Sequence, residues 1–522
     1  MPEQISLKLA IPESQHAALQ RHALMRQSVS REQQQLVSIY YDTRRLALRK
    51  NDVLLRLRRH GNAWLQTVKR QIPSHAGLTR RPAWDAPYLN RFDFTSIDEH
   101  DLREKLQEFS DAGKLTALFE SNLRRTIWRL EPSTGVVILA KLDRGWIASS
   151  GRRSGISELE LQLVSGGIDA LYVVAEQLGA RIALTPETLS KAERGYRLFL
   201  NIQPKSVKAG AVAIDTRATP LIAFRQIALD CMGHMHQNHA GAISTSDPEY
   251  IHQMRVATRR LRAAMRMFNP VLPPGFADQL TPPLRTLMTT LGRARDLDVL
   301  IADIIAPVSS ALPDEPRIAD LSGVITDRLF RARTEAVGAL QKPAYGQLLL
   351  LAAALLHCPP FIGPQEGNSE PDVTSVTNVT NVTESDAASL HPFAHQRLHR
   401  LLKKVQSLAR QARIEDPPSL HELRIAIKRL RYAIEFFGPA LHGRSANALV
   451  ARLAGLQDRL GHLNDLASAG ALLMACAGNN ALLREAVTLI GGWHGQRHAT
   501  LLGELPARIA KLKSLRLPDL RK

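Results

Sequence analysis

Two patterns of apolar and polar residues divide the chain near residue 218. Before that point, short segments alternate apolar with charged or polar side chains, as in VLLRLRR (53–59). Alternation with a period of two predicts half-buried strands. It places Arg56 and Arg58 on one face of their strand and the leucines between them on the other. Because a charged inward face suits a barrel with a polar interior, we expect an antiparallel β structure of that kind.

After residue 218 helical periodicity replaces the strand patterns, and one motif occurs twice. HQMRVATRRLR (252–262) is repeated as HELRIAIKRLR (421–431), so that His252 corresponds to His421. The offset between these two histidines, here called the repeat offset, also relates LGRARDLD (291–298) to LGHLNDLA (460–467). One register held over two separated motifs indicates an internal duplication.

These patterns predict the domain boundaries. A polar segment rich in Pro, Ser and Thr separates the two copies and reads as a disordered linker. The predicted parts are a β domain at 1–202, a linker at 203–217 and a helical domain at 218–515, the latter made of repeat one (218–358), a linker insert (359–389) and repeat two (390–515).

Charge narrows the class of ligand. The 522 residues include 68 Lys and Arg against 49 Asp and Glu, a net charge of +19, and such a field attracts polyanions. The three cysteines lie far apart and form no metal-ligand spacing, which fits a reducing compartment. We see no signal peptide, and the most apolar run, GQLLLLAAALLHC (346–358), is too short to span a bilayer. We therefore expect a cytoplasmic protein in which this run forms a buried helix.

The repeated motif predicts a helix with one cationic face. At about 100° per residue, the basic side chains of each copy fall in one stripe and the apolar ones opposite it. The stripes comprise His252, Arg255, Arg259, Arg262 and Arg266 in the first copy, and His421, Arg424, Lys428 and Arg431 in the second. One alternative is a solvated face, partly neutralised by Asp296, Asp298 and Asp465.

Two features favour a bound polyanion over a solvated face. The stripes occur in register in both copies and carry almost no acidic residue, and the planar fork of arginine suits phosphate oxygens. Aromatic residues are only 5% of the chain, which disfavours single-stranded nucleic acid, whose bases stack on rings. A phosphate chain without bases therefore fits better.

With these motifs the second part of the chain resembles the CHAD family, the conserved-histidine α-helical domain, over about residues 205–515. The resemblance implies two pseudo-symmetric helical bundles around a basic surface that binds inorganic polyphosphate. The implied ligand-binding residues are His252, Arg255, Arg259, Arg262, His421, Arg424, Lys428 and Arg431.

The first part resembles the CYTH family, the triphosphate tunnel enzymes, through segments such as YYDTRRLALRKNDVLLRLRRHGNAWLQTVKR (40–70) and SKAERGYRL (190–198). The resemblance implies an eight-stranded antiparallel tunnel, so the whole chain is expected to be α+β, a β tunnel followed by a duplicated all-α domain. The implied triphosphate-binding residues are Lys8, Arg56, Arg58, Lys69, Arg125 and Lys191.

The acidic side of this family's pattern is incomplete here. The opening Glu-x-Glu-x-Lys signature reads Gln4-Ile5-Ser6-Leu7-Lys8, and the third of three alternating glutamates is Gln162. The implied metal ligands that remain are Asp143, Glu158 and Glu160. Mg²⁺ or Mn²⁺ prefers carboxylate oxygens, so Gln4, Ser6 and Gln162 would weaken such a site. Alternatively, Glu158 and Glu160 pair with the arginines of the tunnel.

Together these features predict an inorganic polyphosphate-binding protein. Its tunnel would bind triphosphate or a polyphosphate end with weak or lost hydrolysis, and no residue is assigned a catalytic role. One alternative is an active metal-dependent inorganic triphosphatase. Another is a basic interaction module that recruits the protein to nucleic acid or storage granules.

Overall fold

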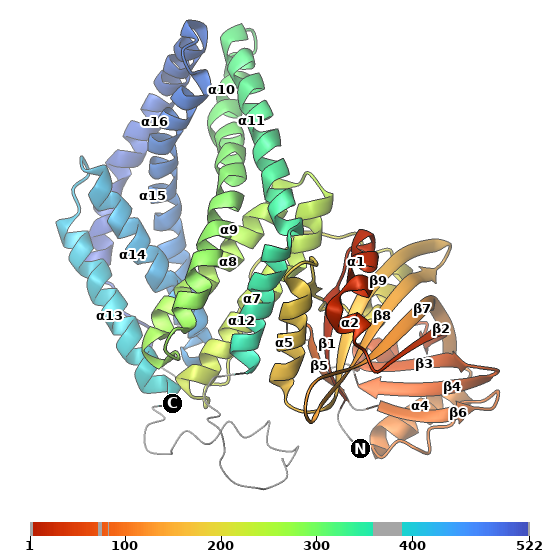
Figure 1. Ribbon diagram of the computed structural model, residues 1–522. Coiled ribbons are helices and arrows are strands. Elements are labelled where there is room, and N and C mark those ends of the chain that lie inside the picture. The colour runs from red at the N-terminus through yellow and green to blue at the C-terminus, as the bar shows by residue number, and fades with distance from the viewer. Residues whose placement is uncertain (1–3, 71–75, 82, 359–388, 520–522) are drawn as a thin grey trace. The chain divides into compact units, whose positions relative to one another are not determined.

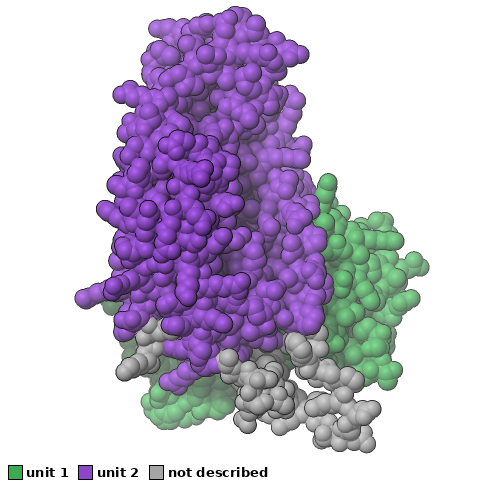
Figure 2. All heavy atoms as spheres, turned by 90° about the vertical axis from the view of Figure 1, so that its left-hand side faces the viewer, with its two compact units in different colours: residues 1–205, 341–359 green, residues 206–340, 360–522 purple. Residues whose placement is uncertain are grey.

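The computed structural model of the protein describes residues 4–70, 76–81, 83–358 and 389–519 (Figure 1). The chain forms two compact units, coloured separately in Figure 2: unit 1 contains residues 1–205 and 341–359, and unit 2 contains residues 206–340 and 360–522. The predicted linker insert at 359–389 lies outside the described residues except for its last position.

Unit 1 is built on one curled antiparallel sheet, as predicted. The sheet order is β10-β1-β9-β8-β7-β2-β3-β4-β6, and β5 pairs with β1. Because β5 directly precedes β6 in the chain, the sheet curls from β6 back to β1 and forms a tunnel (Figure 1). The strands are β1 (Gln4–Ala10), β2 (Ser30–Thr43), β3 (Val53–His60), β4 (Ala63–Arg70), β5 (Leu78–Arg81), β6 (Ala83–Tyr88), β7 (Leu115–Ser133), β8 (Val136–Ser149), β9 (Arg152–Ser165) and β10 (Thr185–Pro186).

The described residues thus contain ten strands where eight were expected. Two features account for the difference: β5 and β6 are separate strands, and β10 is a two-residue strand paired with the end of β1. The short helices η1 (Glu13–Gln15), α1 (His16–Arg21), α2 (Ala23–Arg26) and α3 (Ala47–Lys50), together with α4 (His100–Asp111), α5 (Ile168–Gly179) and α6 (Lys191–Phe199), complete this part of unit 1.

The pleat of the strands separates a charged inner face from an apolar outer one. On β3 and β4, Leu55 and Val68 face outward into a core with Leu102 and Leu106 of α4. Along β7 the inner face changes from Arg125 through Leu123 to Phe119, and Leu123 and Phe119 share a core with Tyr196 of α6. Helix α6 therefore packs on the apolar end of the inner face.

Packing at α6 depends on one glycine. A Cβ atom at Gly195 would lie 2.2 Å from the ring of Phe119, so only glycine lets the helix approach the sheet this closely. The Ser190 side chain caps the helix by accepting a hydrogen bond from the Glu193 amide. As a result Lys191, the first residue of α6, is held at the charged layer of the tunnel.

Helix α12 (Pro343–His357) carries the apolar run of the sequence and belongs to unit 1. The domain prediction placed this segment in repeat one (218–358). In the structure it packs beside α5, where a Cβ atom at Gly346 would lie 1.9 Å from the Leu184 carbonyl oxygen and the His357 ring stacks on Tyr172 at 6.2 Å. Because leucine and alanine occur on most sides of the helix, it was expected to be buried, and most of those side chains are. No helix in the described part of the chain is long and apolar enough to cross a membrane.

In its described residues unit 2 is built from helices and contains no β-strand, as expected for the second half. Its helices are α7 (Pro220–Ser244), α8 (Pro248–Phe268), η2 (Asn269–Val271), α9 (Phe276–Val299), the π-helix η3 (Leu300–Ile305), α10 (Ala306–Ala311), α11 (Pro316–Gln341), α13 (Leu390–Gln411), α14 (Pro417–Phe436), η5 (Gly438–Ala440), α15 (Gly443–Ala477) and α16 (Ala481–Lys513).

Segments related by the repeat offset also form equivalent helices in the structure. Helices α8 and α14 carry the two motifs, and both begin at an Asp-Pro pair, Asp247-Pro248 and Asp416-Pro417. Proline at the first helical position has a backbone angle suited to a helix start, and the Asp247 side chain caps α8 by accepting from the Glu249 amide. The same local signal therefore starts both helices.

Four phenylalanines join the two repeats in one core. Phe393 corresponds to Phe224 by the repeat offset, and Phe437 corresponds to Phe268. The rings of Phe268 and Phe437 lie 5.6 Å apart, and Phe393 lies 5.1 Å from Phe268. Equivalent residues thus meet across the junction, which fits a duplicated helical unit folded around a pseudo-twofold relation.

Candidate anion-binding sites

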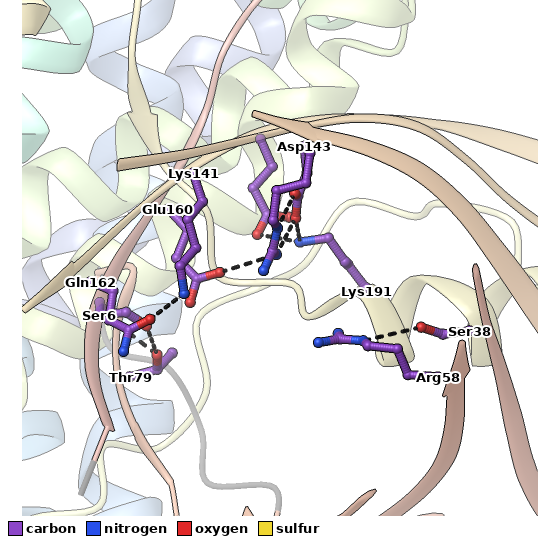
Figure 3. A network of polar contacts seen from close by, with 11 residues as sticks. Ser6, Ser38, Arg58, Thr79, Lys141, Asp143, Glu160, Gln162 and Lys191 are labelled. Carbon is purple, nitrogen blue, oxygen red and sulfur yellow. Dashed lines mark hydrogen bonds and ion pairs between the residues drawn. The ribbon is translucent and has the colours of Figure 1, made fainter. Parts of the chain in front are cut away.

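The inner face of unit 1 gathers the charged residues that the sequence singled out. Adjacent strands place Lys8 opposite Glu160, and Asp143 opposite both Arg125 and Glu158. Lys191 of α6 reaches the same layer (Figure 3). The cations of this layer are Lys8, Arg56, Arg58, Lys69, Arg125, Lys141 and Lys191, and the carboxylates are Asp143, Glu158 and Glu160.

Asp143 is the centre of the ion-pair network. The Arg125 guanidinium donates two parallel hydrogen bonds to its carboxylate, at 2.6 and 2.7 Å, and Lys191 Nζ lies 2.9 Å from Oδ2. Lys191 also donates to Glu158 at 2.8 Å. Burial alone would raise the pKa of Asp143, but Lys191 and Arg125 hold it well below its usual range. The network is therefore ionised and internally paired at neutral pH.

The side of the tunnel formed by β3 and β4 is different, because its cations face one another. The charge of Arg56, with burial and Arg125, lowers the pKa of Arg58 to about 9. Burial, followed by Arg56, lowers the pKa of Lys69 to about 7, and Glu160 only partly opposes this shift. Arg58 Nε lies 3.5 Å from the Ser38 hydroxyl, a neutral group. Asp85 of β6 lies on the same face, opposite Thr67, and accepts a hydrogen bond from its hydroxyl at 2.6 Å. Among the described residues, the positive charge on this side is therefore only partly balanced by carboxylates.

Neutral residues occupy the positions of three expected carboxylates. Ser6 and Gln162 lie directly opposite each other on β1 and β9. The Ser6 hydroxyl bonds that of Thr79 at 3.0 Å, and Lys141 Nζ donates to the Gln162 side-chain oxygen (Figure 3). Gln4 lies on the same strand, with its backbone opposite Arg81. A hydrogen-bonded neutral network thus replaces the acidic edge of the tunnel.

Sequence reasoning missed Lys141 as a member of this layer. The signal was present, because Lys141 precedes Asp143 by two positions on a strand and so shares its face. Burial lowers the pKa of Lys141, while Glu160 opposes that shift. Thr79 was also missed, since a threonine in a short strand carries no sequence feature that marks it as a partner of Ser6.

The carboxylates of the tunnel do not fit a divalent metal centre. Mg²⁺ and related ions take several oxygen ligands, most of them carboxylates. Among the described residues, no group of three or more His, Cys, Asp or Glu side chains is arranged to hold a metal ion. Arg125 and Lys191 engage both oxygens of Asp143, and Lys191 engages one oxygen of Glu158. Within the described part of the tunnel, the other Glu158 oxygen is buried without a hydrogen-bond partner.

The second candidate site, here called the basic surface, is formed by the cationic faces of α8 and α14 in unit 2. As the periodicity predicted, the opposite faces of both helices are buried; on α8 they include Ala257, Leu261 and Phe268. Arg255 Nη1 donates to the Gly292 carbonyl at 3.0 Å and to Asp296 at 2.9 Å. The Arg255 guanidinium lies 3.8 Å from where a Cβ atom of Gly292 would be.

The second repeat reproduces this arrangement in part. Arg424 lies over Gly461, with Nη2 3.6 Å from the position of a Cβ atom. In both repeats a glycine therefore leaves room for a guanidinium on the neighbouring helix. Among the described residues, Arg424 Nε is buried without a hydrogen-bond partner, whereas Arg255 is anchored to a carboxylate.

Cations of the two repeats meet around Lys428. Burial, followed by the charges of Arg259, Arg424 and Arg431, lowers the pKa of Lys428 to about 7, and Asp465 opposes this shift. Arg259 belongs to α8 and the other three cations belong to α14. The two stripes therefore form one continuous field of positive charge.

Further along the basic surface, cations of the two repeats again lie close together. Burial lowers the pKa of Arg266, and the charges of Arg429 and Arg262 lower it further. Arg266 therefore lies near Arg262 of its own repeat and near Arg429 of the other repeat. Of the acidic residues considered as neutralising partners, Asp296 pairs with Arg255, whereas Asp298 pairs with Arg333 of α11 at 2.6 Å. Neutralisation of the stripes by these residues is partial.

The two motif histidines lie in different surroundings. Burial and the charge of Arg295 lower the pKa of His252 to about 4, so its ring is neutral at pH 7 in this structure. His421 Nδ1 instead lies 2.9 Å from the Asn464 side-chain oxygen. Asn464 and Arg295 are equivalent positions in the repeats. A single exchange therefore makes the two histidine environments unequal.

A curled antiparallel tunnel lined with cations, together with a duplicated helical unit that carries a basic surface shared by its two repeats, defines the class. Residues 3–196 match the CYTH domain family, and residues 226–474 match the CHAD domain family. The chain is 33% identical to the CHAD domain from the plant Ricinus communis, whose crystal structure aligns with 61% of this chain and 99% of that one at a TM-score of 0.50.

The chain therefore belongs to the CHAD family, and its first part matches the model of the CYTH domain family. It is also similar to the inorganic triphosphatase of Haemophilus influenzae, with 28% identity over 198 residues. That match covers 38% of this chain and 55% of the relative, so the chain spans about half of that protein's length.

Proposed function

We propose that the chain binds inorganic polyphosphate on the basic surface. The observation that carries this proposal is the position of Lys428 among Arg259, Arg424 and Arg431. Asp465 offsets part of this charge, and Glu435 pairs with Arg431 at 3.2 Å. Cations held this close repel one another, and a linear polyanion lying along α8 and α14 would relieve that repulsion. Arginine forks bind phosphate oxygens in pairs, which favours phosphate over other anions.

The tunnel, on this proposal, binds triphosphate or the end of a polyphosphate chain with weak or lost hydrolysis. Arg56, Arg58 and Lys69 supply the positive charge that such a group requires. Cleavage of a phosphoanhydride commonly depends on metal ions that neutralise developing charge. Asp143 and Glu158 are instead engaged by the protein's own cations, and Ser6 and Gln162 are neutral.

The second candidate function is metal-dependent hydrolysis of inorganic triphosphate. Similarity to the inorganic triphosphatase of Haemophilus influenzae favours it. In that case Asp143, Glu158 and Glu160 would hold Mg²⁺ or Mn²⁺, which would require Lys191 and Arg125 to release their carboxylates. Hydrolysis of tripolyphosphate by the purified chain separates the two candidates.

A third candidate, a basic module that recruits the protein to nucleic acid or granules, is tested by competition. The chain is titrated with fluorescent polyphosphate, and single-stranded DNA of equal total charge is added at one fixed salt concentration, since salt weakens both interactions. We expect DNA to displace polyphosphate only at a large excess. Displacement at equal charge concentration would favour the third candidate and contradict selectivity for phosphate chains.

A further inference from the structure

The junction between the repeats contains one hydrogen bond that the charge pattern does not explain. Arg259 Nε, on α8, donates to the Tyr432 phenol oxygen, on α14, at 2.7 Å. Tyr432 is buried, with 2% of its surface exposed, and its ring stacks with Phe436 at 6.2 Å between centroids. The phenol oxygen is therefore a fixed acceptor that belongs to the other repeat.

From this geometry we infer that Tyr432 is a positioning residue, which orients Arg259 for a phosphate ligand without neutralising it. The inference rests on the proposed polyphosphate function. Arg259 is surrounded by like charges, and repulsion from Lys428 would otherwise turn its side chain toward solvent. The bond to Tyr432 engages Nε, and among the described residues neither Nη group of Arg259 has a hydrogen-bond partner, so both are left to a ligand.

The choice of a phenol as the acceptor has a physical consequence. Arg255 is anchored by the Asp296 carboxylate, which cancels much of its charge for a distant anion. A neutral acceptor fixes the guanidinium plane and preserves its full charge. Arg259 is therefore both ordered and fully cationic, the state in which its fork binds phosphate with the smallest loss of side-chain entropy.

The hydrogen bond between Arg259 and Tyr432 has no counterpart between the equivalent positions of the two repeats. The position equivalent to Tyr432 in repeat one is Ala263, and the position equivalent to Arg259 in repeat two is Lys428. An alanine offers no acceptor, so the reciprocal bond cannot form. Repeat two therefore supplies the residue that completes the site of repeat one, and the basic surface is one composite site with unequal halves.

The test is a double-mutant cycle on the full chain, read as affinity for linear polyphosphate of uniform length. Tyr432→Phe removes the acceptor but keeps the ring and every formal charge. We expect affinity to fall about tenfold, the size of one hydrogen bond to a charged group. Arg259→Lys keeps the charge and lacks the Nε donor, so adding Tyr432→Phe to it should cost no further affinity.

Two readouts separate positioning from a general loss of structure. The salt dependence of binding should keep its slope in Tyr432→Phe, since no charge is removed. Tyr250→Phe is the matched control, because Tyr250 is a buried tyrosine of α8 that packs on Gly241, away from the bond between Arg259 and Tyr432. The polyphosphate affinity of this variant should equal that of the native chain.

The outcomes are distinct. Native affinity in Tyr432→Phe, or an equal loss on adding Tyr432→Phe to Arg259→Lys, overturns the inference while leaving the proposed function intact. A native chain that fails to bind polyphosphate overturns the proposed function and the inference together. Tenfold weaker binding that disappears in the Arg259→Lys background supports the inference.

Discussion

The Asp143 network in the tunnel and the cluster around Lys428 on the basic surface contain the same types of cationic side chain in opposite surroundings. In the tunnel, Arg125 and Lys191 are matched by buried carboxylates at hydrogen-bonding distance. On the basic surface, Lys428 lies among arginines and its pKa falls to about 7. The difference teaches that cation content alone does not identify a ligand site. The decisive property is whether the protein already supplies the counter-charge.

The largest effect is expected where charge is already matched. Asp143→Asn should lower the free energy of unfolding of unit 1 by about 3–5 kcal/mol, because it leaves the buried charges of Arg125 and Lys191 less compensated. Denaturant unfolding can be followed by tryptophan fluorescence in a Trp493→Phe background, since the other four tryptophans lie in unit 1.

Glu131→Gln is the control for this variant. Glu131 pairs with Arg129 at the exposed end of β7, and such pairs contribute about 0–1 kcal/mol. If Asp143→Asn were no more destabilising than Glu131→Gln, the tunnel network would not be a matched one, and the contrast between the two regions would fail.

On the basic surface the corresponding change should affect binding rather than folding. Arg255→Gln combined with Arg424→Gln removes one guanidinium from each repeat, and we expect polyphosphate affinity to fall about 100-fold, from two charge-assisted contacts of about 1.5 kcal/mol each. Arg293→Gln with Arg459→Gln is the control of equal charge, on an exposed side chain of α9 and a half-buried one of α15, paired with Glu335 and Glu504. Equal losses in both double variants would mean that only net charge matters.

Restoring carboxylates should bring the tunnel closer to a metal-binding one. Ser6→Glu with Gln162→Glu places two carboxylates on directly opposed positions of β1 and β9. We expect Mn²⁺ to raise the melting temperature of this variant, with about 2.7 kcal/mol of stabilisation at a metal concentration 100 times Kd, and to leave that of the native chain unchanged. Equal stabilisation of the native chain would show that its own carboxylates suffice.

A smaller, graded change in polyphosphate affinity is expected when the pH is varied. Because Lys428 has a pKa of about 7 in the free protein and a bound anion favours its charged form, polyphosphate binding should weaken by up to tenfold per pH unit above about 7. Lys428→Arg should flatten this profile, since arginine stays charged. A native profile as flat as that of the variant would contradict the assignment.

The sign for folding is the reverse of the sign for binding. The folded-state pKa of Lys428 lies below the ordinary lysine value of 10.5, so the unfolded chain binds more protons between about pH 7 and 10.5. The contribution of this residue to stability therefore increases with pH across that window.

Sequence patterns predicted the parts of the molecule that depend on periodicity. Alternation in β3 and β9 places the charged residues on one face, and the repeat offset brings Phe268 against its counterpart Phe437. Both follow from rules that act along one element or between copies of it. The predicted families and the predicted α+β architecture, which also depend on such local patterns, were confirmed.

Contacts between distant segments could not be predicted in this way. The apolar run of α12 indicates burial but not the partner that buries it, and the partner includes α5 of unit 1. The stripe on α8 gives no indication that Arg259 bonds a phenol 173 positions later. Likewise, alternation placed Glu158 inside the tunnel without showing whether a metal or Lys191 would face it.

The most direct test of the central claim, that the tunnel's carboxylates serve its own cations rather than a metal, is phosphate release from tripolyphosphate. The purified full chain is assayed with Mg²⁺ and then with Mn²⁺, and polyphosphate binding is measured on the same sample. We predict binding without turnover above that of a chelator-treated control. Metal-dependent turnover that chelator abolishes would contradict this account and make the protein a triphosphatase despite Ser6 and Gln162.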